Sequence, residues 1–286
     1  MAQFKNLMPI RTKGDAPPLF CVHGEPLQIA FRIRNDRPLY GVSLLYHPNL
    51  GYLGDELPVT IEEYARVYLE DVRRVQPKGP YYLCGYSAGG MIAFEMARQL
   101  LDQGEEIGDL TLVEPTVYAE DFAGASNGPG KVSSALQYIR SEKNKFKAIR
   151  FVIARLFRAI TNIINKKLVE ATTSFYLWAH LTLPQKLRWA ALIRDMRPAM
   201  RRYGYKPFSC KVKIVYCVMD KKHFEWWDAF WQEKMIGQAE LITLPDAWTH
   251  RQLMEDPGLS QTVDIIDESV ASATSPYTHD KSTAPA

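Results

Sequence analysis

Long apolar runs are absent from this sequence. No stretch approaches the roughly 20 consecutive apolar residues that span a bilayer, so no membrane-spanning helix is expected. Residues 1–5 lack the apolar segment that directs secretion, and we therefore expect a cytoplasmic protein. An excess of one charge is also missing, because 35 Lys and Arg residues nearly balance 32 Asp and Glu residues. Without a basic nucleic-acid motif, we expect no nucleic-acid partner.

Cysteine is scarce, with four residues and no C-x-x-C pair. All four lie in apolar, strand-like runs, at Cys21, Cys84, Cys210 and Cys217. Such positions predict buried, reduced thiols and favour neither a zinc site nor a disulfide framework. We therefore expect no metal and no redox cofactor.

Short apolar runs alternate with helical patterns along most of the chain. Runs typical of strands cover residues 18–23, 38–45, 81–84, 110–113, 212–219 and 241–244, and helical patterns cover 60–75, 91–104 and 259–270. This alternation predicts an α/β fold with a mostly parallel, doubly wound sheet.

The alternation breaks after Glu120, where a long helical pattern begins. It predicts a helical lid of about residues 121–207, inserted in a single domain of residues 1–270. Residues 131–167 are strongly basic, with Glu142 as their one acid, and apolar residues recur there at helical spacing. Residues 271–286 are rich in Ser, Thr, Pro and Ala, and we expect them to be a disordered tail.

A glycine-rich turn joins the strand pattern before residue 85 to the helical pattern after residue 90. Residues 85–89, Gly-Tyr-Ser-Ala-Gly, fit the G-x-S-x-G nucleophile elbow. A serine on such a sharp turn needs small neighbours two residues away on each side. The pattern predicts Ser87 as a nucleophile. The amide of Ala88, at a helix N-terminus, is predicted to donate to a developing oxyanion.

A second oxyanion donor is expected in the loop after an early strand. His23, Gly24, Glu25 and Pro26 follow the run at 18–23. Proline has no amide proton, so the amide of Glu25 is the candidate donor. His23 is interpreted as a structural histidine at a strand end.

A serine nucleophile requires a base, and the base requires an orienting acid. In hydrolases with this elbow, the order along the chain is serine, acid, histidine. His250 lies in a turn-rich loop after the last strand pattern and is the candidate base. Glu114 and Asp220 each end a strand pattern after the elbow, and either residue is a candidate for the acid.

Residues 61–63, 76–90 and 93–97 together resemble the thioesterase domains that end nonribosomal peptide and polyketide synthases. Similarity extends from about residue 19 to residue 256. It implies an α/β-hydrolase fold and a thioesterase that takes an acyl, polyketide or peptidyl chain from a phosphopantetheine or CoA thioester onto serine. Hydrolysis or cyclisation then releases the chain. The matching positions make Ser87 the nucleophile, His250 the base and Glu114 the acid, where the family usually has aspartate.

The resemblance also implies an acyl or peptidyl carrier protein as partner. Because such proteins are typically acidic, the basic face of the predicted lid suits one, with an anionic membrane as the less favoured alternative. Two rival functions stay open. One is a carboxylester hydrolase with the same triad, and the other is a non-catalytic binding protein, suggested by the unusual Glu25 and Glu114.

Overall fold

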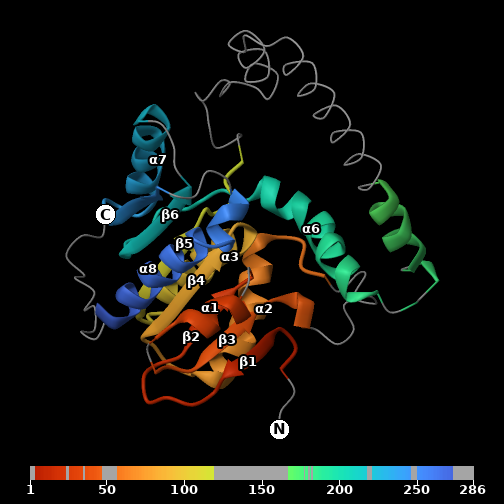
Figure 1. The fold of residues 1–286 in the computed structure, drawn as a ribbon, viewed down its shortest axis with the longest axis horizontal. Helices are drawn as coiled ribbons and strands as arrows, with labels where there is room; N and C mark the ends of the chain where they lie inside the picture. Colours follow the sequence, from red (N-terminus) through yellow and green to blue (C-terminus); the bar gives the residue numbers. More distant parts are fainter. Residues whose placement is uncertain are drawn as a thin grey trace. The chain divides into compact units, whose positions relative to one another are not determined.

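The described part of the chain contains a seven-stranded sheet (Figure 1). The structure is a computed structural model, and it describes residues 4–23, 26–34, 36–46, 57–118, 167–176, 178–179, 181, 183–217, 221–245 and 250–272. The strands are β1 (Leu7–Arg11), β2 (Leu19–Val22), β3 (Leu39–Val42), β4 (Tyr81–Tyr86), β5 (Ile107–Val113), β6 (Val212–Cys217) and β7 (Ala239–Leu244). Their spatial order is β1-β3-β2-β4-β5-β6-β7. Only the β1–β3 pair is antiparallel within this sheet.

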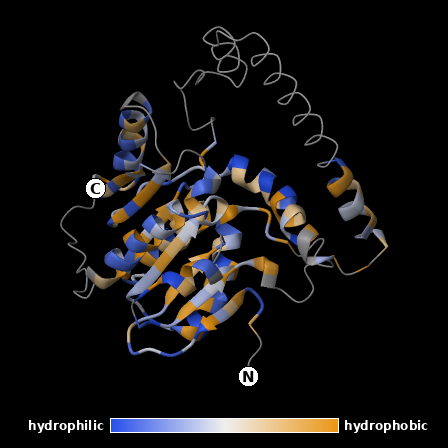
Figure 2. Cartoon of the chain, viewed as in Figure 1, coloured by the Kyte–Doolittle hydropathy of each residue, from blue (hydrophilic) through white to orange (hydrophobic). Residues whose placement is uncertain are grey.

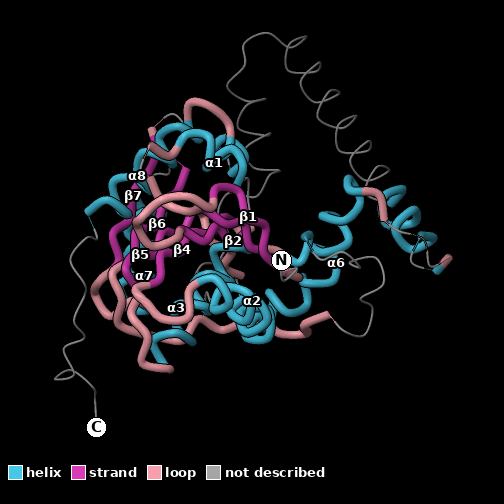
Figure 3. Tube along the Cα trace, turned by 90° about the horizontal axis from the view of Figure 1, so that it is seen from below, coloured by secondary structure: helices cyan, strands magenta, loops and turns pink. Residues whose placement is uncertain are grey.

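Helices cover both faces of the sheet. The helices of the described residues are α1 (Pro26–Arg32), α2 (Ile61–Val75), α3 (Ala88–Asp102), α6 (Gln185–Arg202), α7 (Lys221–Lys234) and α8 (Gly258–Ser272), with short 3-10 turns η1 (Leu44–Tyr46) and η5 (His250–Met254). Figure 3 shows α1 and α8 on one face and α2 and α3 on the other. The predicted doubly wound, mostly parallel sheet is confirmed.

Two elements near the N-terminus were not predicted. Strand β1 contains Pro9, which interrupts the apolar pattern and is tolerated because β1 is an edge strand. Helix α1 begins at Pro26, a position where the fixed φ of proline suits a first helical turn. Sequence analysis had placed that residue in a loop.

The chain divides into two compact units. The first comprises Met1–Pro48, Glu56–Val117 and Met196–Ala286, and it contains the sheet. The second comprises Asn49–Asp55 and Tyr118–Asp195. In the second unit, residues 167–176 and the first part of α6 are helical, within the range expected for the lid. The basic segment up to residue 166 and the tail from residue 273 lie outside the described residues, and α8 extends two residues into the range expected for the tail.

Apolar side chains in the strands and the elbow helix form the core of the first unit. Strands β2 and β3 are buried along their whole length, and α3 is buried at every position from residue 88 to residue 97. Figure 2 shows apolar residues concentrated in these central strands. A sheet with buried faces explains why these strands appear as continuous apolar runs in the sequence.

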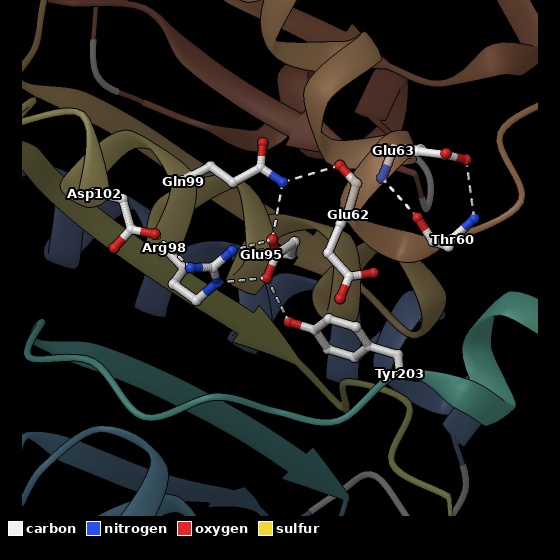
Figure 4. A network of polar contacts seen from close by, with 8 residues as sticks. All are labelled: Thr60, Glu62, Glu63, Glu95, Arg98, Gln99, Asp102 and Tyr203. Carbon is white, nitrogen blue, oxygen red and sulfur yellow. Dashed lines mark hydrogen bonds and ion pairs between the residues drawn. The ribbon is translucent and has the colours of Figure 1, made fainter.

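A buried carboxylate joins α3 to its neighbours (Figure 4). The side chain of Glu95 is 1% exposed. It accepts hydrogen bonds from Arg98 and Gln99 of the same helix and from the Tyr203 hydroxyl, which is 2.9 Å away. Gln99 also donates to the carbonyl oxygen of Glu62 in α2. A buried charge is tolerated here because hydrogen-bond donors surround it.

A capping box begins α2 beside this network. Glu63 N donates to Thr60 Oγ1 over 3.2 Å, and Thr60 N donates to Glu63 Oε2 over 3.3 Å. These two bonds satisfy amides at the helix start that have no partner within the helix.

We expect Tyr203→Phe to destabilise the fold because it removes one donor from buried Glu95. The expected loss in the free energy of unfolding is about 1–3 kcal/mol, measured by urea denaturation. Arg66→Met is the control, since its ion pair with Glu70 is exposed (62% and 58%) and is worth less than about 1 kcal/mol. A Tyr203→Phe effect no larger than that of Arg66→Met would contradict this account.

Candidate active site

Ser87 occupies a sharp turn between β4 and α3. Its backbone has φ 56° and ψ −121°, a conformation that is strained for a residue with a side chain. Ser87 N donates to Val113 O over 2.9 Å, and its carbonyl oxygen accepts from the amides of Gly90 (3.0 Å), Met91 (3.3 Å) and Thr116 (3.1 Å). Backbone hydrogen bonds to two segments therefore hold the strained turn in place.

The glycines of the motif are required by close backbone contacts. A Cβ atom on Gly89 would overlap the carbonyl oxygen of Val22 in β2, and one on Gly85 would overlap the carbonyl oxygen of Gly89. Ala88 is the first residue of α3, where amides have no acceptor within the helix. Its amide is thus in the position expected for an oxyanion donor. Glu25, the second predicted donor, lies outside the described residues.

Glu114 and His250 meet at the edge of the sheet where the parallel strands end. Glu114 follows β5 directly, and its amide donates to Val215 O of β6 over 2.8 Å. His250 begins η5. Its Nδ1 lies 2.8 Å from Glu114 Oε2, and because a carboxylate only accepts, Nδ1–H is the donor. The side chains of His250 and Glu114 are 47% and 21% exposed. Asp220, the other candidate acid, lies outside the described residues.

Two side chains that sequence analysis did not identify hold this pair. The ring of Tyr86 stacks on that of His250, with centroids 4.7 Å apart and planes 18° apart. Its hydroxyl donates to the His250 carbonyl oxygen over 2.8 Å. Cys217, at the end of β6, donates from Sγ to Glu114 Oε1 over 3.4 Å. Burial and the nearby charge of Glu114 raise the pKa of the Cys217 thiol to about 11, so it stays protonated and can donate.

The sequence contains only indirect signals for the roles of Tyr86 and Cys217. Tyr86 precedes Ser87, and Cys217 ends β6, the strand that pairs with β5. Both contacts depend on strand order and register, which the sequence pattern does not define.

The Ser87 hydroxyl lies near a second hydroxyl group. Ser87 Oγ and Thr116 Oγ1 are 3.4 Å apart, and the Thr116 carbonyl oxygen accepts from the Tyr205 hydroxyl over 2.7 Å. Between the described side chains, hydrogen bonds join His250 to Glu114, but none joins Ser87 to His250. The structure therefore brings the candidate base and acid together, with the candidate nucleophile on the adjacent turn.

His23 is a buried structural residue, as its position at a strand end suggested. The side chain follows β2, and Nε2 lies 2.8 Å from the hydroxyl of Tyr68. That hydroxyl also accepts from the amide of Leu44 over 3.0 Å. Burial lowers the pKa of His23 to about 3, so its ring is neutral at physiological pH.

Neither a metal site nor a membrane-spanning helix is found within the described ranges. No group of three or more His, Cys, Asp or Glu side chains there could hold a metal ion. The helices in those ranges are too short or too polar to cross a membrane.

Neutral His23 predicts a loss of stability in acid. The unfolded chain takes up a proton near pH 6.5, whereas the folded chain does so only near pH 3, so the free energy of unfolding falls as pH is lowered between these values. From pH 6.5 to pH 5 we expect wild type to lose roughly 2 kcal/mol relative to His23→Gln. Urea denaturation across this range measures the difference. Exposed His223→Gln is the control, and a His23→Gln difference that does not change with pH would contradict the assignment.

Comparisons with known proteins indicate one family. The family model described as "Thioesterase domain" matches residues 28–266. The chain is 40% identical over 129 residues to a dimodular nonribosomal peptide synthase of Bacillus subtilis (strain 168), covering 43% of this chain and 5% of that protein. It is 32% identical over 176 residues to malpinin synthetase of Mortierella alpina, covering 57% of this chain and 2% of that protein. The chain thus spans only a small part of these relatives.

A solved structure supports the fold. The NocB thioesterase domain from the nocardicin cluster superimposes with a TM-score of 0.58 at 21% identity, covering 93% of this chain and 99% of that one. The resemblance inferred from the elbow and its flanks is confirmed. This chain belongs to the thioesterase domain family and has the α/β-hydrolase fold.

Proposed function

We propose that this chain releases an acyl, polyketide or peptidyl chain from a thioester on carrier-protein phosphopantetheine, or on CoA, through an acyl-serine intermediate. The observation that carries the proposal is the hydrogen bond between His250 and Glu114 beside the strained Ser87 turn. Membership of the thioesterase family and the peptide synthase relatives support a thioester substrate. A non-catalytic binding protein would have no need of this histidine–carboxylate pair next to a serine elbow.

The first step acylates Ser87. Glu114 holds Nδ1–H of His250, which leaves Nε2 as the base. The Ser87 hydroxyl moves from Thr116 towards His250 and gives its proton to Nε2 while Oγ attacks the thioester carbonyl carbon. The C–S bond then breaks, and His250 returns the proton to the departing sulfur, which leaves as a thiol.

The second step releases the chain. Water, or a nucleophile within the acyl chain, loses a proton to His250 Nε2 and attacks the ester carbonyl. The bond between that carbon and Ser87 Oγ breaks, and the serine regains its proton. In both steps the amides of Ala88 and Glu25 are the proposed donors to the oxyanion.

The acid in this proposal is Glu114, where the family usually has aspartate. Its side chain is one methylene longer, and two contacts define its position. Oε2 accepts from His250 and Oε1 accepts from Cys217. These two hydrogen bonds hold the carboxylate of Glu114 in one position beside His250, although its side chain is longer than that of aspartate.

The proposed substrate determines which cofactors and partners are needed. The two acyl transfers use no metal or redox cofactor, and phosphopantetheine is part of the substrate. An acyl or peptidyl carrier is the proposed protein partner, and the basic residues of segment 131–167 support its docking on the lid. Membrane contact through the same segment is the less favoured alternative, and the proposed location is the cytoplasm.

The triad assignment predicts the effects of four variants. Ser87→Ala and His250→Ala should lower turnover of an acyl-pantetheine thioester at least about 10³-fold, because each removes a group from the proton transfer. Glu114→Gln should lower it by about 10³- to 10⁴-fold, since the imidazolium loses its charge partner. Thiol release detected with a chromogenic disulfide measures these rates. Asp220→Asn should remain within about threefold of wild type, and the reverse order for the two acids would refute the choice of Glu114.

Substrate preference separates this proposal from a carboxylester hydrolase. With matched acyl groups, we expect kcat/KM for the pantetheine thioester to exceed that for the oxygen ester. Both substrates are measured with wild type and with Ser87→Ala as the blank. A clear preference for the oxygen ester would favour the hydrolase rival while leaving the triad intact.

A further inference from the structure

The imidazole of His250 has close contacts on one edge and on one face. Glu114 accepts from its Nδ1 edge, and the ring of Tyr86 covers a face at 4.7 Å with an angle of 18°. The second contact has no role in the proton transfer described above. It places the π-electrons of an aromatic ring directly against the group that becomes charged.

We propose that Tyr86 is a positioning residue for His250, whose stacked ring also stabilises the imidazolium formed when Ser87 attacks. An aromatic face attracts a cation within about 6 Å of the ring centroid, and the observed distance lies inside that limit. The neutral imidazole gains much less from the same contact. The interaction is therefore stronger in the transition state than in the resting enzyme, which is the condition for raising the chemical rate.

A second contact of Tyr86 keeps the stacking geometry. Its hydroxyl donates to the carbonyl oxygen of His250 over 2.8 Å. The Tyr86 backbone ends β4 and precedes Ser87, whose turn is held by the hydrogen bonds to Val113 and Thr116. Tyr86 thus connects the Ser87 turn to the histidine segment, although Tyr86 and His250 lie 164 residues apart in the sequence.

The inference rests on the proposed function only in taking Ser87 and His250 as nucleophile and base. We test it with a fluorophosphonate probe, which forms an Oγ–P bond on Ser87 with loss of fluoride and needs no thioester. The second-order rate of labelling reports activation of Ser87. Labelling at a normal rate without any thioester turnover would contradict the proposed function alone.

Tyr86→Leu should slow labelling roughly three- to thirty-fold, because the aromatic face is lost. Tyr86→Phe keeps that face and loses only the hydroxyl contact with the His250 carbonyl oxygen, so it should slow labelling less than Tyr86→Leu does. Tyr40→Leu is the matched control, since Tyr40 lies in β3 and its ring stacks on that of Phe20 in the core at 5.6 Å. It should label at the wild-type rate per folded molecule. Tyr86→Leu within twofold of wild type, or Tyr86→Phe as slow as Tyr86→Leu, would overturn the proposal.

A second test uses wild-type protein, so it does not depend on whether Tyr86→Leu folds. A stacked tyrosine shifts the C–H protons of the His250 ring upfield in the NMR spectrum. These signals are assigned by their loss in His250→Ala. An upfield position that moves to the ordinary histidine value in Tyr86→Met supports the stack, and an ordinary value in wild type would overturn it.

Discussion

The strained backbone of Ser87 is the constraint on which the rest of the site depends. A φ of 56° at a residue with a side chain persists only where surrounding structure enforces it. Here the end of β5, the start of α3 and the segment containing Thr116 all hydrogen-bond to the same residue. The glycines at 85 and 89 permit the close packing against β2 and α3 that these bonds require. These contacts fix the Ser87 turn at the sheet edge.

The same edge gathers groups from distant parts of the sequence because the central strands are parallel. β4 contributes Tyr86, β5 leads to Glu114 and β6 ends at Cys217, and each of them contacts His250 or its carboxylate partner. Each strand is held by its neighbours on both sides. The rigid sheet thus supplies precise positions, while the loops after it supply the chemical groups.

The sequence was sufficient to predict the alternation of strands and helices and the glycine-rich elbow. These features depend on local patterns of apolar residues and glycine. The choice of Glu114 over Asp220 stayed open in the sequence, because both residues end strand patterns and the contact between Glu114 and His250 joins residues 136 positions apart in the chain. Tyr86 and Cys217 were missed since their roles come from register and packing. β1 was missed because Pro9 breaks its pattern.

An acyl-serine mechanism requires that Ser87 receives the acyl group from a thioester. Mass spectrometry can detect this transfer in protein that is mixed with an acyl-pantetheine thioester and quenched in acid. We expect an added acyl mass on the peptide that contains Ser87, formed together with an equal amount of free thiol. Thiol release with the acyl group on another residue, or with no acyl-enzyme under conditions where release is limiting, would contradict it.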